Sequence, residues 1–189
     1  MNAITIENLT KKYKNTVAVD NLNLSIKQGE LFALLGGNSA GKTTTIKMLS
    51  CLIKPTSGDA YLLGDSITSN PHTIKKKINI SPQETAVTAN LSVLENLKLI
   101  AGIYGKDSKT ANKNAHEIAC KFGLEQELNK KAKNLSGGMQ RHLSIAMALI
   151  SEPQILFLDE PTLGLDVLAR HELWASIKSL KGKVTIILT

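Results

Sequence analysis

One stretch of the sequence constrains the fold more than any other. The apolar run ELFALLG, residues 30–36, leads directly into a glycine-rich turn and then into the helix-like segment KTTTIKMLSCLI, residues 42–53. Residues 36–43 read GGNSAGKT and satisfy the pattern G-x-x-x-x-G-K-[ST] in the strand–turn–helix context that the pattern requires. Successive backbone N–H groups and a helix N-terminus then form a nest for phosphate groups. We therefore predict a phosphate-binding loop on an α/β core.

This loop supplies most of the expected nucleotide-binding residues. Lys42 would reach the β- and γ-phosphates, and the Thr43 hydroxyl would bind Mg²⁺. The alternative is a flexible glycine-rich turn with one exposed lysine. The residues expected to bind nucleotide here are Gly36, Gly37, Asn38, Ser39, Ala40, Gly41, Lys42, Thr43 and Thr44.

A pair of acidic residues follows another apolar run, ILFL at residues 155–158. Asp159 ends a predicted buried strand, so its carboxylate would emerge at the carboxyl edge of a parallel sheet, where such sheets bind ligands. There Asp159 can hold Mg²⁺, and Glu160 beside it would polarise an attacking water. Alone, such a pair is often only the end of a strand. Together with the phosphate-binding loop, it favours a nucleotide-hydrolysing site.

Strand-like and helix-like segments alternate along the chain. Residues 4–13 and 18–26 alternate apolar and polar residues like half-buried strands, whereas residues 30–36, 155–158 and 183–189 resemble fully buried strands. The middle third is helical, with a capping box at residues 92–95 and a second amphipathic segment that Gly123 ends. We predict an α/β fold with a P-loop NTPase core: a mostly parallel sheet, an N-terminal antiparallel β subdomain and an inserted α-helical subdomain at about residues 85–150.

Composition narrows the function classes. Hydrophobic residues make up 42% of the 189 residues, which is enough for a real core. The net charge is +7, but the densest basic run is only Lys75 to Lys77, so no specific nucleic-acid role is expected. The two cysteines, Cys51 and Cys120, lack metal-ligand spacing and are expected to be buried free thiols. We identify neither a signal peptide nor an apolar stretch of bilayer-spanning length.

The segment LSGGMQR, residues 135–141, places two glycines at the start of an otherwise good helix. Each glycine inside a helix costs about 1 kcal/mol. Ser136 would serve as an ordinary N-cap of that helix. The glycines remain to be explained, and their presence indicates that another group approaches this backbone closely.

These motifs, in this order, resemble the nucleotide-binding subunit of ATP-binding-cassette (ABC) transporters, and the resemblance covers essentially the whole chain. LSGGMQR is similar to the family's signature motif, Gln83 to the Q-loop glutamine, and residues 164–166 to the D-loop. Tyr13 stands where the family stacks an aromatic ring on adenine. Where the family usually has glycine, the phosphate-binding loop has Ser39, which would be strained at a positive φ.

The resemblance implies that the signature motif acts in trans. Two cassettes, in a homodimer or a heterodimer, would pair head to tail around ATP and Mg²⁺. Ser136, Gly137 and Gly138 of one cassette would contact the γ-phosphate held by the other. Glu160 would be the general base, and Gln83 would touch Mg²⁺ and the attacking water.

The resemblance also implies an ATPase that drives transport, in the export direction, through a separate integral membrane permease. The subunit would then be cytoplasmic and peripheral on the inner face of the cell membrane. A soluble ABC ATPase acting on ribosomes or nucleic acid, and an ATP-binding module without catalysis, stay open as alternatives.

Finally, the resemblance places a switch histidine shortly beyond Thr189. None of the four histidines of this chain, at positions 72, 116, 142 and 171, occupies that place. We therefore expect residues 1–189 to be one ATP-binding-cassette domain truncated at its C-terminus. Such a fragment would bind Mg-ATP and hydrolyse it weakly or not at all.

Overall fold

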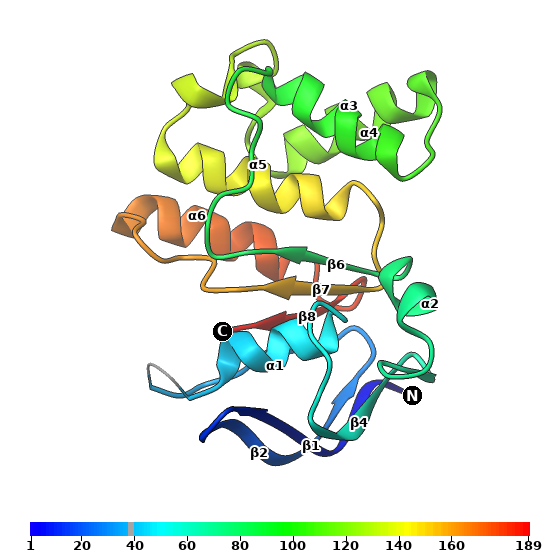
Figure 1. Ribbon diagram of the computed structural model, residues 1–189. Helices are drawn as coiled ribbons and strands as arrows, with labels where there is room; N and C mark the ends of the chain where they lie inside the picture. Colours follow the sequence, from blue (N-terminus) through cyan, green and yellow to red (C-terminus); the bar gives the residue numbers. More distant parts are fainter. Residues whose placement is uncertain (38–39) are drawn as a thin grey trace. The chain divides into compact units, whose positions relative to one another are not determined.

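The computed structural model describes residues 1–37 and 40–189 (Figure 1). Asn38 and Ser39 of the predicted phosphate-binding loop lie outside the described residues. The chain divides into two compact units. The first unit comprises Met1–Ile80, Gln154–Asp159 and Lys181–Thr189, and the second unit comprises Ser81–Pro153 and Glu160–Leu180.

The N-terminal segments form an antiparallel sheet, as their alternating pattern predicts. Its strands have the order β2-β1-β4-β5, with β1 at Asn2–Tyr13, β2 at Thr16–Lys27, β4 at Ser57–Leu62 and β5 at Asp65–Ser66. In β1, Ile4, Ile6 and Leu9 are buried, whereas the residues between them are more exposed. One face of this sheet therefore packs on the core of the first unit.

The second sheet carries the two ends on which the predicted site depends. Its strands have the order β3-β8-β7-β6, with β3 at Leu31–Ala33, β8 at Thr185–Leu188, β7 at Ile155–Leu158 and β6 at Ile78–Ser81. The pairs β3 with β8 and β7 with β8 are parallel, and β7 and β8 run side by side in Figure 1. Every residue of β7 and β8 is buried, as predicted.

The prediction of a fully buried strand at residues 30–36 is wrong. Only Leu31–Ala33 is a strand, and its side chains are half-buried or exposed. Leu35 is 90% exposed. The physical reason is position, because β3 has β8 as a neighbour on one side and ends the strand order on the other.

Two helices belong to the first unit, α1 at Lys42–Leu49 and α2 at Pro71–Lys75. The helical pattern of the sequence continues to residue 53, but the Ser50 hydroxyl donates to the Ile46 carbonyl and Cys51 has a φ of 57°. A left-handed residue cannot continue an α-helix, so α1 ends before it. Ile46, Met48 and Leu49 of α1 are buried in the aliphatic core of the first unit.

The second unit is helical. Its elements are α3 at Val93–Ile103, α4 at Ser108–Lys121, η1 at Glu125–Glu127, η2 at Ala132–Asn134, α5 at Gly137–Leu149 and α6 at Val167–Lys178. Helix α5 is buried along most of its length, and α3, α4 and α6 all contact it. The signature segment is therefore mounted on the central helix of this unit.

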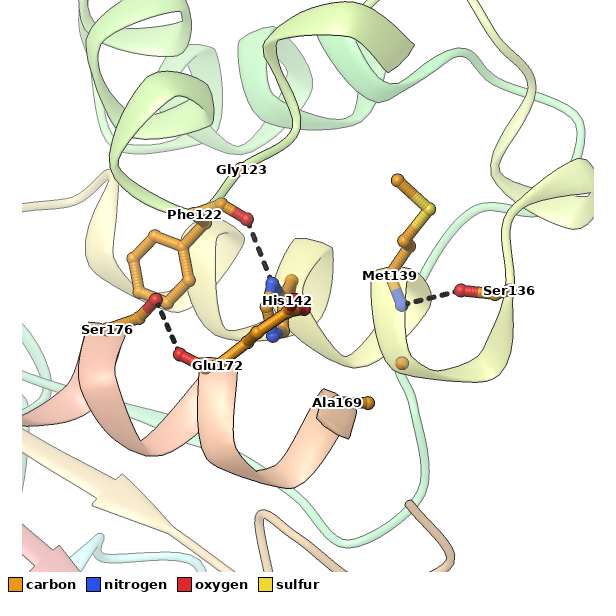
Figure 2. Close-up of a pocket in the computed structure, with 9 residues that line it drawn as sticks. Phe122, Gly123, Ser136, Met139, His142, Ala169, Glu172 and Ser176 are labelled. Carbon is orange, nitrogen blue, oxygen red and sulfur yellow. Dashed lines mark hydrogen bonds between the residues drawn. The ribbon is translucent and has the colours of Figure 1, made fainter. Parts of the chain in front are cut away.

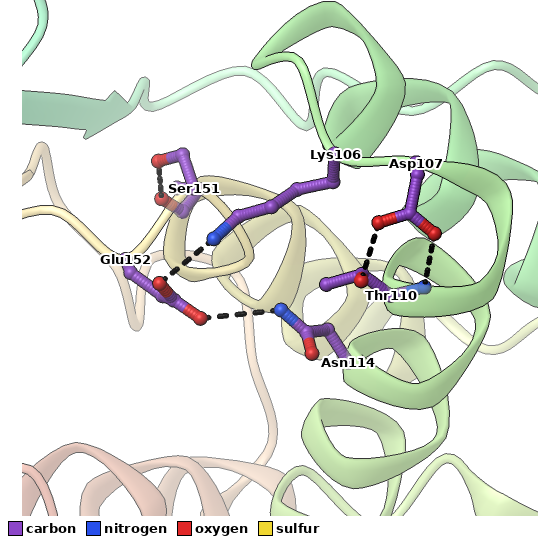
Figure 3. A network of polar contacts seen from close by, with 7 residues as sticks. Lys106, Asp107, Thr110, Asn114, Ser151 and Glu152 are labelled. Carbon is purple, nitrogen blue, oxygen red and sulfur yellow. Dashed lines mark hydrogen bonds and ion pairs between the residues drawn. The ribbon is translucent and has the colours of Figure 1, made fainter.

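Local polar bonds define the helix ends. The predicted capping box is confirmed, because Ser92 Oγ accepts from the Glu95 N–H and the Glu95 carboxylate accepts from the Ser92 N–H. Those bonds to Ser92, from its backbone first, lower the pKa of Glu95. At the other end of the unit, Glu152 accepts from Lys106 at 2.9 Å and from Asn114 at 3.2 Å (Figure 3). That network ties the chain after α5 to α4 and to the turn before it.

Neither cysteine of the described residues forms a disulfide. The expectation that both are buried is wrong for Cys120, which is exposed on α4, whereas Cys51 is half-buried and burial raises its pKa. In residues 1–37 and 40–189, no helix combines the length and apolar character needed to cross a bilayer.

Candidate nucleotide-binding site

The predicted phosphate-binding loop joins β3 to α1, as the strand–turn–helix pattern requires. Gly41 is the N-cap of α1 and has a φ of 81°. A Cβ atom at this position would lie 2.2 Å from the Ala18 carbonyl oxygen and 3.0 Å from Val19 Cγ2. Both the left-handed backbone and the close approach of β2 therefore require glycine.

Lys42 is held at the loop it follows. Its ammonium donates to the carbonyl oxygens of Gly36 at 2.7 Å and Gly37 at 3.0 Å. Ala40 also bonds to the loop, through its N–H and the Gly37 carbonyl at 3.2 Å. Gly36, Gly37 and Ala40 are exposed, so the described part of the loop presents its backbone to solvent. Thr44 follows Thr43 in the first turn of α1 and is half-buried.

The Thr43 hydroxyl and the Asp159 carboxylate, far apart in sequence, meet directly. Thr43 Oγ1 donates to Asp159 Oδ1 at 3.2 Å, and Thr189 Oγ1 donates to the same oxygen at 2.7 Å. Asp159 is only 5% exposed and follows β7 at the carboxyl edge of the parallel sheet. The sequence analysis assigned Thr43 and Asp159 to the same Mg²⁺ ion but predicted no bond between them. It did not identify Thr189, because nothing in a strand pattern marks its last hydroxyl.

Glu160 directly follows Asp159 and adopts an unusual backbone conformation. Its φ is 45°, in the left-handed region that costs a residue with a side chain about 1–2 kcal/mol. Its carbonyl accepts from the Leu163 N–H at 3.2 Å, which forms a turn, and its side chain is half-buried. Strained residues of this kind cluster at functional sites, which supports the role expected for Glu160.

Gln83 and Tyr13 are both accessible. Gln83 is exposed in the segment after β6, and its carbonyl accepts from the Arg141 guanidinium at 3.2 Å.

Tyr13 ends β1 and is 46% exposed, with the Lys11 ammonium 5.2 Å from the centre of its ring. An exposed ring at the end of a strand has a free surface for stacking.

Residues 135–138, which we call the signature turn, lead into α5. Ser136 is the N-cap, and its hydroxyl accepts from the Met139 N–H at 3.2 Å. A Cβ atom on Gly138 would lie 3.0 Å from the Cβ of Ala169, so α6 restricts this position. A Cβ atom on Gly137 would meet no atom of the described residues within 4 Å. The chain itself therefore accounts for one glycine of the pair and leaves the other unexplained.

Ser136, Gly138 and His142 are among the residues that line a cavity of about 320 Å³, which Figure 2 shows. His142, on the next turn of α5, bonds through Nδ1 to the Phe122 carbonyl at 2.9 Å. Since a carbonyl only accepts, Nδ1 carries the proton. His142 Nε2 is buried without a partner among the described residues. The imidazole thus fastens α5 to the end of α4.

The predicted site residues divide between the two units. Tyr13, the described part of the phosphate-binding loop and Asp159 belong to the first unit, whereas Gln83, the signature turn and Glu160 belong to the second. Within the first unit the structure brings Thr43 and Asp159 into contact. Within the second unit it connects Gln83 with the segment after Glu160 through Arg141, a residue that the sequence analysis did not single out.

Comparison with known proteins shows which family contains a chain of this kind. The family described as ABC transporter matches residues 19–163, and this range contains the loop, the signature segment and the acidic pair. The chain belongs to the ABC transporter family. The predicted fold class is confirmed as well, because solved ABC transporter cassettes match 98% or more of this chain with TM-scores of 0.86 and 0.90.

Two relatives and one solved structure illustrate the family. The daunorubicin/doxorubicin resistance ATP-binding protein DrrA of Streptomyces peucetius is 38% identical over 98% of this chain. The Nod factor export ATP-binding protein I of Ralstonia nicotianae is also 38% identical over 98% of this chain. The dimeric post-hydrolysis structure of the ATP-binding cassette MJ0796, bound to ADP and phosphate, is 31% identical with a TM-score of 0.86 and covers 98% of this chain.

The shares of the partner chains differ. This chain spans 87% of the MJ0796 structure but only 56% of DrrA and 58% of the Nod factor export protein. It therefore corresponds to little more than half of those two relatives.

Proposed function

We propose that this ABC transporter chain binds and hydrolyses ATP and thereby drives transport through a separate membrane permease. The observation that carries the proposal is the bond between the Thr43 hydroxyl and the buried Asp159 carboxylate. It joins the residue after the P-loop lysine to the acidic end of β7, which is the pairing that a Mg-nucleotide site needs. The names of DrrA and of the Nod factor export protein support export as the direction.

Thr43 and Asp159 fit a magnesium ion. Both present oxygen atoms, which are the ligands Mg²⁺ prefers, and the two oxygens already lie 3.2 Å apart. We propose that Thr43 and Asp159 hold Mg²⁺, and that Gln83 reaches it as well. When bound, the ion would neutralise negative charge on the phosphates.

The chain's own residues carry the remaining steps. The backbone of residues 36–44 and the Lys42 ammonium would hold the phosphate chain, and Tyr13 would stack on the adenine. Glu160 would accept the proton of the water that attacks the γ-phosphate in line, and Gln83 would orient that water. Catalysis of this kind depends on positioning and charge neutralisation more than on covalent chemistry.

The signature turn is proposed to complete the site of another cassette. Ser136 and Gly137 are exposed, Gly137 has open space beside it, and the N–H groups of the first turn of α5 favour a negatively charged group. A γ-phosphate bound by a second cassette is such a group. The dimeric MJ0796 structure supports pairing of this kind, with a homodimer and a heterodimer both compatible.

We propose that the permease partner would hold the subunit on the cytoplasmic face of the membrane. The family's transporters need a translocation pathway, and the two relatives named above are ATP-binding proteins of resistance or export systems. A soluble ABC ATPase acting on ribosomes or nucleic acid is the less supported candidate, because the relatives belong to transport systems. We further propose that residues 1–189 form one cassette domain with its helical subdomain at about residues 85–150.

Steady-state ATP hydrolysis by the full-length protein tests the proposal, with and without Mg²⁺. Wild type should hydrolyse ATP only with Mg²⁺, and Lys42→Ala should lose nucleotide binding. A tagged subunit extracted with mild detergent should also retain an integral membrane protein. Hydrolysis without Mg²⁺, or retention of ribosomes instead of a membrane protein, would contradict it.

A further inference from the structure

Arg141 is the last residue of LSGGMQR and is buried in α5, with only 4% of its surface exposed. Its guanidinium donates to backbone carbonyls of two segments. The Nε–H group donates to Pro161 at 3.0 Å, and one terminal nitrogen donates to Pro82 at 2.5 Å and to Gln83 at 3.2 Å. A single side chain therefore holds two loop segments that are distant from each other in sequence.

Both segments adjoin residues to which the proposed function gives a role at the attacking water. Gln83 is itself one of the acceptors, and Pro161 follows Glu160 directly. Glu160 needs external support, because its φ of 45° is not one that a glutamate adopts readily. A fixed carbonyl at the next residue limits the rotation that would release that backbone.

The chemistry of the side chain suits this task. Guanidinium is planar, and its donors form a rigid fork, so it fixes the relative positions of the acceptors that it bonds. A lysine ammonium is a point charge on a flexible stem and sets no such geometry. Burying a cation is costly, and structural support alone is available more cheaply from apolar packing.

The same helix carries Ser136 at its N-terminus. We propose that Arg141 is a positioning residue that couples the signature turn to the Gln83 and Glu160 segments. The inference rests on the proposed function. A displacement of α5 caused by a phosphate at Ser136 moves the guanidinium, and the guanidinium moves both loop segments together. Contact in trans at the signature is thereby linked to alignment of the water-activating groups in the same chain.

His142 provides a matched control. It is adjacent in sequence, 8% exposed and bonded to one backbone carbonyl, that of Phe122. Its bond fastens α5 to the end of α4 and involves neither loop segment. Loss of either side chain leaves carbonyls unpaired and destabilises the unit, but only loss of Arg141 releases the segments at Gln83 and Glu160.

The test compares Arg141→Lys with His142→Leu in the full-length protein, below the melting temperatures of both variants. Arg141→Lys should lower kcat for ATP by about 10- to 100-fold with KM within about twofold, because displaced catalytic groups affect the reaction step more than binding. His142→Leu should keep kcat within about twofold of wild type. Equal kcat losses in the two variants, or a wild-type kcat in Arg141→Lys, would overturn the proposal.

Amide hydrogen exchange gives a readout that does not need hydrolysis. Arg141→Lys should raise exchange at Gln83, Glu84, Thr162 and Leu163 together, and His142→Leu should not. If wild type hydrolyses no ATP, the proposed function fails, and this exchange still decides the role of Arg141. Unchanged exchange at both segments overturns the coupling. If Arg141→Lys does not fold, Arg141→Gln replaces it in the same comparison.

Discussion

Two glycine-containing turns lead into helices in this chain, and they differ in what requires their glycines. The turn before α1 needs Gly41 for internal reasons, since β2 passes 2.2 Å from where a Cβ atom would lie and the backbone is left-handed. The turn before α5 has Gly137 in ordinary helical backbone with open space beside it. Contacts within the chain therefore explain the glycine of the first turn. The glycine of the second turn is explained only if a group from another molecule approaches it.

The largest effect is expected from a variant that stops ATP hydrolysis but still binds ATP, because it should trap the dimer in which the turn before α5 is proposed to act. Glu160→Gln keeps the shape of the side chain and removes the base, so hydrolysis should fall by about 10²–10⁴-fold. ATP binding should persist, and an ATP-dependent dimer should accumulate on size-exclusion chromatography of the full-length protein. Turnover at the wild-type rate would contradict the assignment of Glu160.

Ser136→Arg tests whether the second turn acts on another molecule. The bulky cation fills the space that a γ-phosphate in trans would need, so the ATP-dependent dimer should be lost at concentrations where wild type forms it. The Kd of the monomer for ATP should stay within about twofold, which titration calorimetry measures. A tenfold weaker monomer Kd would show that the turn serves its own chain, and the comparison would fail.

Gly41→Ala tests the internal requirement of the first turn. The added Cβ atom meets the Ala18 carbonyl at a left-handed φ, so the free energy of unfolding should fall by about 3 kcal/mol. Gly64→Ala is the control, because Gly64 has a φ of 88° and no atom in the described part of the chain lies within 4 Å of the added Cβ. It should lose only about 1 kcal/mol. Equal losses in urea unfolding would mean that β2 does not restrict Gly41.

The glycine pair of the second turn offers a smaller contrast within one helix. Gly137→Ala should leave the free energy of unfolding unchanged or raise it by up to about 1 kcal/mol, since alanine favours a helix. Gly138→Ala should raise the free energy of unfolding by less than that, or lower it, because its Cβ atom would lie only 3.0 Å from the Cβ of Ala169. Both free energies come from urea unfolding. A larger loss at Gly137 than at Gly138 would reverse our explanation.

The smallest expected effect concerns pH and the capping box of α3. Because bonds to Ser92 lower the pKa of Glu95 in the folded state, its carboxylate stabilises the fold fully above the unfolded pKa of about 4.3. That contribution is lost as pH falls further, through the folded pKa. Glu95→Gln keeps an acceptor for the Ser92 N–H but does not titrate. Its unfolding free energy should decline less steeply than that of wild type between about pH 5 and pH 3.

Local patterns in the sequence were the most reliable guides. The capping box at Ser92, the end of α4 at Gly123 and the buried strand before Asp159 all follow from short-range chemistry, and the structure has them. The run at residues 30–36 misled, because an apolar segment does not reveal whether its strand has neighbours on both sides. The end of α1 was missed because Cys51 adopts a left-handed φ that a cysteine rarely shows.

For the site, the sequence identified motif residues but not the residues that hold them. Arg141 was not singled out because its acceptors are backbone carbonyls 20 and 59 positions away, and carbonyls have no sequence signature. Thr189 was missed for a similar reason, since its partner Asp159 is 30 positions away. Side chains that act on a distant backbone become visible only when the chain is folded.

The open space beside Gly137 has a consequence in mass action. If a second cassette must complete each nucleotide site, retention of ATP depends on the amount of protein as well as on the amount of nucleotide. Dilution would then release nucleotide from wild type while leaving its intrinsic affinity unchanged. A permease that holds two cassettes together would raise their effective concentration. The free subunit would thus hydrolyse little ATP, and the assembled subunit would be active.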